Sequence, residues 1–101
     1  MLAHESFGFT MQGCYDLTRV HHHGGHTLRI RIVRDYYAHQ SRAHADVLTP
    51  ALTWTEVASI HPSAWHGDTP LVTDTAAPLN TVALDLLHRA LTDPAPLIRA
   101  V

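Results

Sequence analysis

Lysine is missing from this sequence, and all seven of its basic residues are arginine. Asn80 is the sole asparagine, whereas alanine and histidine are abundant, which is the composition that codon bias in a GC-rich genome produces. The same bias is a sufficient explanation for the ten histidines, so their number alone does not indicate a metal site. Charged residues make up 16% of the chain, fewer than in an average globular domain, which leaves room for a surface covered by a partner.

Cysteine is nearly absent as well, and this excludes an intramolecular disulfide. Cys14 is the single thiol, which fits a reducing compartment or a passive buried side chain. Residues 1–14 have neither the basic start nor the apolar run of a signal peptide, and no segment approaches the roughly 20 apolar residues that a membrane helix needs. We therefore expect no membrane association and a cytoplasmic location.

Internal repeats and low-complexity tracts are also lacking, and 101 residues with 46% apolar content suit one globular domain, 1–101. The clearest local pattern is a hairpin, because residues 15–23 and 26–36 flank Gly24-Gly25, a pair that tolerates the positive φ of a two-residue turn. This turn pairs His23 with His26. One face of the hairpin then carries Leu17, Leu28, Ile30 and Ile32, and the other carries Thr18, Val20, Arg29 and Arg31.

The remaining pattern predicts two more strands and a helix. Residues 41–48 and 53–60 are rich in strand-forming residues, and Val57 breaks the alternation of the second, so that strand is buried on both sides or contains a bulge. Apolar residues recur at helical spacing in 78–92, after a long surface loop at 61–77 and before a tail at 93–101. Residues 1–14 form an arm or an edge strand. The expected fold is α+β, an antiparallel meander of four or five strands, with strands throughout 15–60 and one C-terminal helix packed on the apolar face.

Histidines gather around the Gly24-Gly25 turn and suggest a metal site. In the predicted register, His21 and His23 share a face and His26 lies opposite His23, so three imidazoles could meet at the end of the hairpin. A His-x-His pair with a third histidine is a ligand set that zinc sites use. A small zinc-binding protein is therefore one alternative function, against the simpler interpretation of an exposed turn enriched in histidine. The pairs His39/His44 and His61/His66 are weaker candidates.

Arginines and aromatic residues suggest a second kind of site. Arg29 and Arg31 share one face of a strand, and Tyr36 and Tyr37 follow them, as in a β-ribbon that binds nucleic acid. The net charge of −2 argues against nucleic acid as the partner, and the solvent face of an amphipathic strand is the simpler interpretation. Trp65 lies in the proline-containing loop, so we expect it to be an exposed binding residue, and we expect Trp54 to be buried.

Catalytic motifs are missing too. No Gly-x-Ser-x-Gly elbow, phosphate-binding loop, Cys-x-x-Cys pair or dinucleotide-binding fingerprint occurs, so we expect no enzyme and no catalytic residue. Residues 34–62 contain a Gln-Ser step at Gln40-Ser41 and a Trp-x-x-Val strand at Trp54 and Val57. In these features the segment resembles small uncharacterised proteins of actinobacterial phages and their hosts. The resemblance implies a sheet-rich fold and a location in the host cytoplasm or the virion.

The expected function follows largely by elimination. We expect a non-enzymatic protein-binding or assembly protein, plausibly phage-encoded, with a structural, host-takeover or anti-defence role. It would act through a sheet face, a strand edge or a loop, with an unknown protein partner and with homo-oligomerisation as the default. Metal binding by His21, His23 and His26 and nucleic-acid binding by a β-ribbon are the two alternatives. No cofactor other than zinc is suggested.

Overall fold

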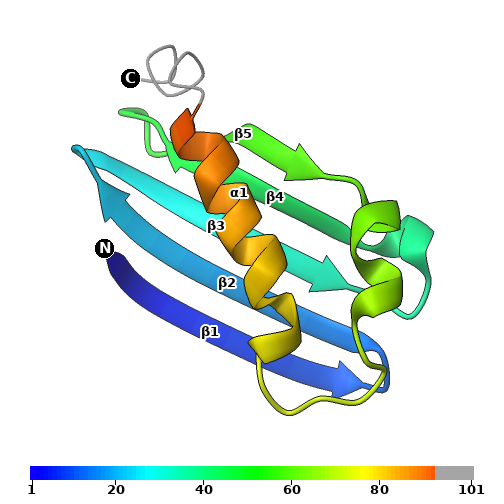
Figure 1. Ribbon diagram of the computed structural model, residues 1–101. Coiled ribbons are helices and arrows are strands. Elements are labelled where there is room, and N and C mark those ends of the chain that lie inside the picture. The colour runs from blue at the N-terminus through cyan, green and yellow to red at the C-terminus, as the bar shows by residue number, and fades with distance from the viewer. Residues whose placement is uncertain (93–101) are drawn as a thin grey trace.

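A computed structural model of the protein describes residues 1–92 and confirms the predicted α+β meander. Five antiparallel strands follow one another in the sheet in chain order, and one helix lies across one face of the sheet (Figure 1). The strands and the helix are β1 (Leu2–Met11), β2 (Cys14–His23), β3 (His26–Arg34), β4 (Arg42–Leu48), β5 (Trp54–Ile60) and α1 (Asn80–Thr92). The outermost strands are β1 and β5, and within residues 1–92 no further strand pairs with their outer edges. The expected arm at residues 1–14 is therefore an edge strand, and the predicted tail at 93–101 lies outside the described residues.

The β2–β3 hairpin has the register that its turn predicts. His23 pairs with His26, His21 with Leu28 and Leu17 with Ile32. Gly24 and Gly25 both have positive φ, 57° and 82°, which glycine adopts without steric cost. The aliphatic residues of one hairpin face are fully buried; they are Leu17, Leu28, Ile30 and Ile32.

Helix α1 covers the aliphatic face of the sheet over β3, β4 and β5. Its buried side chains recur at helical spacing, as expected, and a short 3₁₀ turn (Ala77–Leu79) precedes it. The predicted helix start at residue 78 falls in this turn. The buried residues contributed by the turn and the helix are Leu79, Val82, Ala83, Leu86 and Ala90. No helix among residues 1–92 is long and apolar enough to cross a membrane.

Most of residues 61–77 are exposed, as expected of a surface connection, but the expectation that Trp65 is exposed is wrong. Short 3₁₀ helices occur at Pro62–Ala64 and His66–Asp68, and Trp65 between them is only 4% exposed. The Trp65 ring belongs to the main hydrophobic core and closes the end of the layer between helix and sheet. A proline-rich segment without periodicity does not indicate which of its residues face inward. The sequence therefore could not show that this large aromatic side chain fills the core.

Trp54 was expected to be buried, and this is also wrong, since the residue is 37% exposed. A bulge explains the error. Ala45 pairs with Ala58 but Asp46 pairs with Glu56, so Val57 is an extra residue in β5. The extra residue reverses the alternation, which puts Trp54 and Ile60 on opposite faces of the sheet although both numbers are even. The bulge was one of the two predicted explanations for Val57.

Candidate functional site

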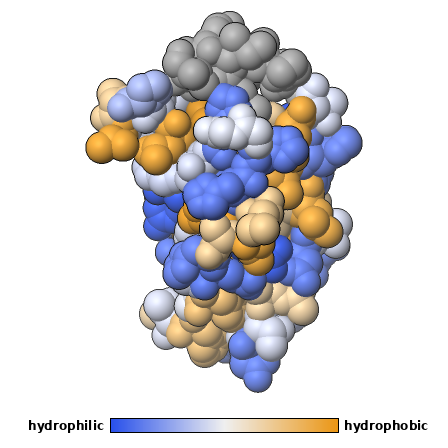
Figure 2. Space-filling model, turned by 90° about the vertical axis from the view of Figure 1, so that its left-hand side faces the viewer, coloured by the Kyte–Doolittle hydropathy of each residue, from blue (hydrophilic) through white to orange (hydrophobic). Residues whose placement is uncertain are grey.

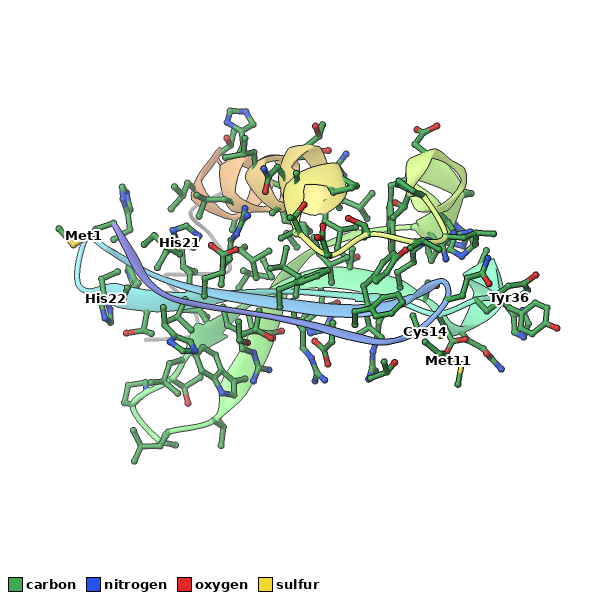
Figure 3. The ribbon with its side chains drawn as sticks, turned by 90° about the horizontal axis from the view of Figure 1, so that it is seen from below. Met1, Met11, Cys14, His21, His22 and Tyr36 are labelled. Atoms are coloured by element: carbon green, nitrogen blue, oxygen red, sulfur yellow. The ribbon has the colours of Figure 1, made fainter. Side chains whose placement is uncertain are left out.

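The sheet face opposite α1, called the open face below, carries most of the charged residues of the sheet. Within residues 1–92 no helix covers it, and Figure 3 shows the β4–β5 loop bending away from the helix side. Antiparallel sheets commonly leave one face to solvent in this way. Any ligand of the open face would therefore meet side chains from β2 to β5 directly.

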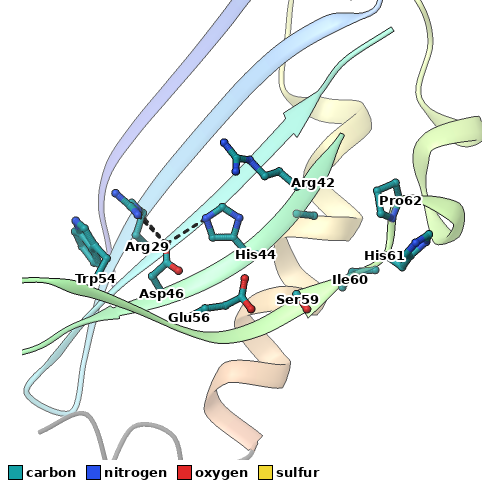
Figure 4. Close-up of a pocket in the computed structure, with 11 residues that line it drawn as sticks. Arg29, Arg42, His44, Asp46, Trp54, Glu56, Ser59, Ile60, His61 and Pro62 are labelled. Atoms are coloured by element: carbon teal, nitrogen blue, oxygen red, sulfur yellow. Dashed lines mark hydrogen bonds and ion pairs between the residues drawn. The ribbon is translucent and has the colours of Figure 1, made fainter. Parts of the chain in front are cut away.

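Asp46 is the centre of an ion-pair cluster on this face. One of its carboxylate oxygens, Oδ2, accepts hydrogen bonds from Arg29 Nη2 at 2.8 Å and from Arg29 Nε at 3.2 Å. His44 Nε2 lies 3.3 Å from the same oxygen. The Asp46 side chain is 6% exposed, and the Arg29 guanidinium also stacks 4.4 Å above the Trp54 ring (Figure 4). A buried carboxylate requires such partners, because an unpaired charge of this kind is strongly destabilising.

A groove of ≈ 510 Å³ surrounds this cluster. It runs from Trp54 to His61 and Pro62 and includes Arg42 and Glu56 (Figure 4). The bulge at Val57 bends β5, and bulges are frequent where a sheet has to re-aim its side chains. Two arginines and two carboxylates line the groove, so their formal charges cancel. The groove is large enough for a small molecule but does not select one sign of charge.

The three residue types of a hydrolase triad are neighbours on the open face. Ser59 lies directly across from His44, and Asp46 lies two residues further along β4. Within residues 1–92, however, no hydrogen bond joins Ser59 to His44. Since nucleophilic catalysis needs the base within hydrogen-bond reach of the nucleophile, this geometry does not suggest a reaction.

The three histidines of the predicted metal site lie on the same side of the hairpin but do not converge. His23 and His26 are directly paired, and His21 is two positions away on the helix side of the sheet, opposite to His22 (Figure 3). Residues 1–92 contain no group of three His, Cys, Asp or Glu side chains placed to hold a metal ion. Partial burial lowers the pKa of the His21 imidazole, and the N-terminal ammonium and Arg19 lower it further. Figure 2 views the molecule from the left-hand side of Figure 1, where the β2–β3 turn lies, and shows hydrophilic residues interspersed with hydrophobic ones.

The predicted binding residues are not brought together in one surface. Arg29 and Arg31 lie on the open face, but each is already paired with a carboxylate, Arg29 with Asp46 and Arg31 with Asp16 at 3.3 Å. Tyr36 and Tyr37 are exposed beyond the end of β3 and contact each other edge to face. Trp65 is buried on the other side of the sheet.

The outer edge of β1 is a second candidate surface. This strand has ten residues, nine of them exposed, and pairs with β2 on one side only. Phe7 and Phe9 lie on its helix side, with ring centroids 6.0 and 5.7 Å from that of Tyr15. Phe9 is 47% exposed. We call these three rings the aromatic strip; it lies beside the part of the sheet that α1 contacts.

Sequence reasoning missed the cluster around Asp46. The alternation of Arg42, His44 and Asp46 was a usable signal, since it places all three on one face of a strand. The pairing of Asp46 with Arg29 depends on the β3–β4 register, which the seven-residue connection at 35–41 does not fix. Comparison of the chain with family models, curated proteins and solved structures finds no match.

Proposed function

We propose that the protein is a non-enzymatic assembly protein that joins copies of itself by strand addition at the outer edge of β1. The observation that carries this proposal is the length and exposure of that edge: ten residues whose outward N–H and C=O groups have no strand to pair with among residues 1–92. An added strand would satisfy these groups, as in other cases of β-augmentation.

The middle part of β1, from His4 to Phe9, has little of the protection that edge strands usually have. Natural edge strands are usually shielded by lysine, proline, a strong bulge or an inward-pointing charge. β1 contains neither lysine nor proline, and its one carboxylate, Glu5, is 3.6 Å from Arg19 of the neighbouring strand. Its middle part, from His4 to Phe9, pairs with β2 without a register shift. The aromatic strip adds exposed apolar area beside the open hydrogen-bonding groups, which favours association.

Sedimentation velocity tests the proposal. We expect the protein at tens of micromolar and pH 7.5 to sediment with a mass above the 11.2 kDa of one chain. Phe9→Glu puts a charge into the aromatic strip and should give a monomer. Leu84→Glu makes the same change at a residue of α1 that is 63% exposed and should leave the association unchanged. Two outcomes would contradict the proposal. One is a wild-type protein that is still monomeric at an assay concentration of 100 µM, and the other is an equal effect of both variants.

Several further points remain predictions. A phage origin and the role that goes with it rest on the resemblance of residues 34–62. Metal binding by His21, His23 and His26 is tested by elemental analysis of untagged protein purified without a nickel column. Nucleic-acid binding would weaken steeply with salt and with Arg29→Ala or Arg31→Ala.

A further inference from the structure

Two arrangements of copies could use the edge of β1, and they differ in symmetry. Pairing of β1 with β5 of the next copy is heterologous and continues into an open array, whereas pairing of β1 with β1 closes a dimer. The β5 edge is shorter, with seven residues, and it contains the bulge at Val57 and the exposed carboxylate of Glu56. These are features by which natural edge strands avoid pairing.

We propose that the occupant of the β1 edge is β1 of a second copy, antiparallel and related by a two-fold axis at Phe7. This inference rests on the proposed assembly function and adds its symmetry and register. The regular part of β1, from His4 to Phe9, limits the choice, because the pairing with β2 shifts register at both of its ends.

The alternation of side chains restricts the register further. In antiparallel self-pairing the two partners of a pair must face the same side, so their residue numbers add to an even number. An axis at Glu5 would place two carboxylates directly opposite each other, which is unfavourable. An axis at Phe7 places the two Phe7 rings opposite each other and keeps the two Glu5 carboxylates apart, each opposite Phe9 of the other copy. Each Phe9 is then also diagonal to Phe7 of the other copy. Ser6 then lies opposite Gly8 of the other copy.

The register at Phe7 covers apolar surface that one chain leaves exposed. The aromatic strips of both copies become continuous, and aromatic pairs across strands are among the more stabilising contacts in sheets. The chain segment after Pro70 passes on the helix side of the sheet near the end of β1 (Figures 1 and 3). Its Leu71 and Val72 are 40% and 67% exposed. The N–H of Gly13 donates to the carbonyl oxygen of Leu71 at 2.6 Å, which holds this segment at the β1–β2 turn, beside the end of β1.

A two-fold axis between antiparallel edge strands is perpendicular to the sheet. Both copies of α1 therefore lie on one side of the dimer, and both open faces form one continuous polar surface on the other side. The grooves around Asp46 are duplicated on this surface, at the β4–β5 end of each copy. The dimer would present them to the same side, which suits a partner with two equivalent binding sites.

Disulfide trapping tests the register. In a Cys14→Ser background, which removes the single thiol, we would prepare Ser6→Cys and Gly8→Cys. Both substitutions are compatible with the fold, since Ser6 is exposed and a Cβ added at Gly8 would have no atom within 4 Å. Mild oxidation of the mixed variants should give a cross-linked heterodimer, identified by its intact mass.

Each variant alone is the control. With the axis at Phe7, the two introduced thiols in a dimer of either single variant are offset by two positions and should not cross-link. Cross-linking of Ser6→Cys alone would place the axis at Ser6, and cross-linking of Gly8→Cys alone would place it at Gly8; either result overturns the register. A further outcome is a mixture that gives no cross-link although the wild-type protein sediments as an oligomer that the Phe9 substitution abolishes. That result overturns the inferred register but leaves the proposed assembly function standing. A monomer in sedimentation overturns both.

Discussion

At the scale of single residues, two buried charged side chains, Asp46 and Arg34, are held by hydrogen bonds. Asp46 receives two hydrogen bonds from Arg29, and Arg34, which is 3% exposed, donates from Nη1 to the carbonyl oxygen of Gly13 at 2.7 Å. Arg34 Nη2 also donates to the carbonyl oxygen of His66. Arg34 therefore connects the β1–β2 turn to the segment that carries Trp65, without a carboxylate partner among residues 1–92.

The reversed exposure of the two tryptophans leads to a prediction about stability. Trp65→Ala should lower the free energy of unfolding by about 3–5 kcal/mol, because it empties a large volume in the core. Trp54→Ala removes a partly exposed ring stacked on Arg29 and should cost about 1 kcal/mol. Urea denaturation of the two variants measures the difference. Similar losses for both would contradict the placement of Trp65 in the core.

A second prediction at this scale concerns His21. Because its pKa is lowered from 6.5 in the folded protein, the unfolded chain takes up a proton at higher pH than the folded chain does. The contribution of this residue to stability is therefore present above pH 6.5 and is lost as the pH falls below it. His21→Gln should show a smaller decrease in melting temperature between pH 7.5 and 5.5 than the wild type.

The matched control for His21 is His23→Gln, which removes an exposed imidazole from the same strand. Thermal denaturation at several pH values, monitored by circular dichroism, compares the three proteins. If His21→Gln loses as much stability on acidification as the wild type does, the environment inferred for His21 is wrong.

At the scale of elements, the sequence predicts those strand pairings and buried faces that depend on residues close together in the chain. A two-residue turn fixes the register of its hairpin, so the pairing of β2 with β3 could be derived from Gly24-Gly25 alone. Periodicity likewise placed the buried face of α1. The register of β3 with β4 depends on a longer connection, and the side on which Trp54 lies depends on the bulge in β5. Both require tertiary packing to be known, and this is why the groove around Asp46 was not predicted.

The two turns that contain glycine at positive φ allow a matched prediction. Gly25 has a φ of 82° and open space around a Cβ, so Gly25→Ala should cost only the backbone strain, about 1–2 kcal/mol. Gly13 has a φ of 81°, and a Cβ there would lie 3.1 Å from Arg34 Nη1 and 3.2 Å from Tyr36 Cδ2. Gly13→Ala should therefore cost about 1–3 kcal/mol more than Gly25→Ala. Equal unfolding free energies of the two variants in urea would show that the β1–β2 turn is less tightly packed than described.

At the scale of the whole molecule, the arrangement is asymmetric. One face of the sheet is closed by α1 and Trp65, and the other carries paired charges and a groove. One edge strand has ten residues and is regular from His4 to Phe9, and the other has seven residues with a bulge in its middle. Such asymmetry favours one defined mode of association over many, because among residues 1–92 a single edge combines unpaired backbone groups with an exposed aromatic ring, Phe9.

The histidine content should make the proposed association sensitive to pH. The formal charge is −2 with neutral histidines, and protonation of all ten would bring it to −2 + 10 = +8. Copies with this charge would repel one another, and His4 lies on β1, the strand proposed to pair between copies. We expect sedimentation at pH 5 to show a smaller average mass than at pH 7.5. Because repulsion between exposed charges is screened by salt, about 0.5 M NaCl at pH 5 should restore part of the association. An average mass that is the same at both pH values would mean that the interface is insensitive to the charge of the histidines.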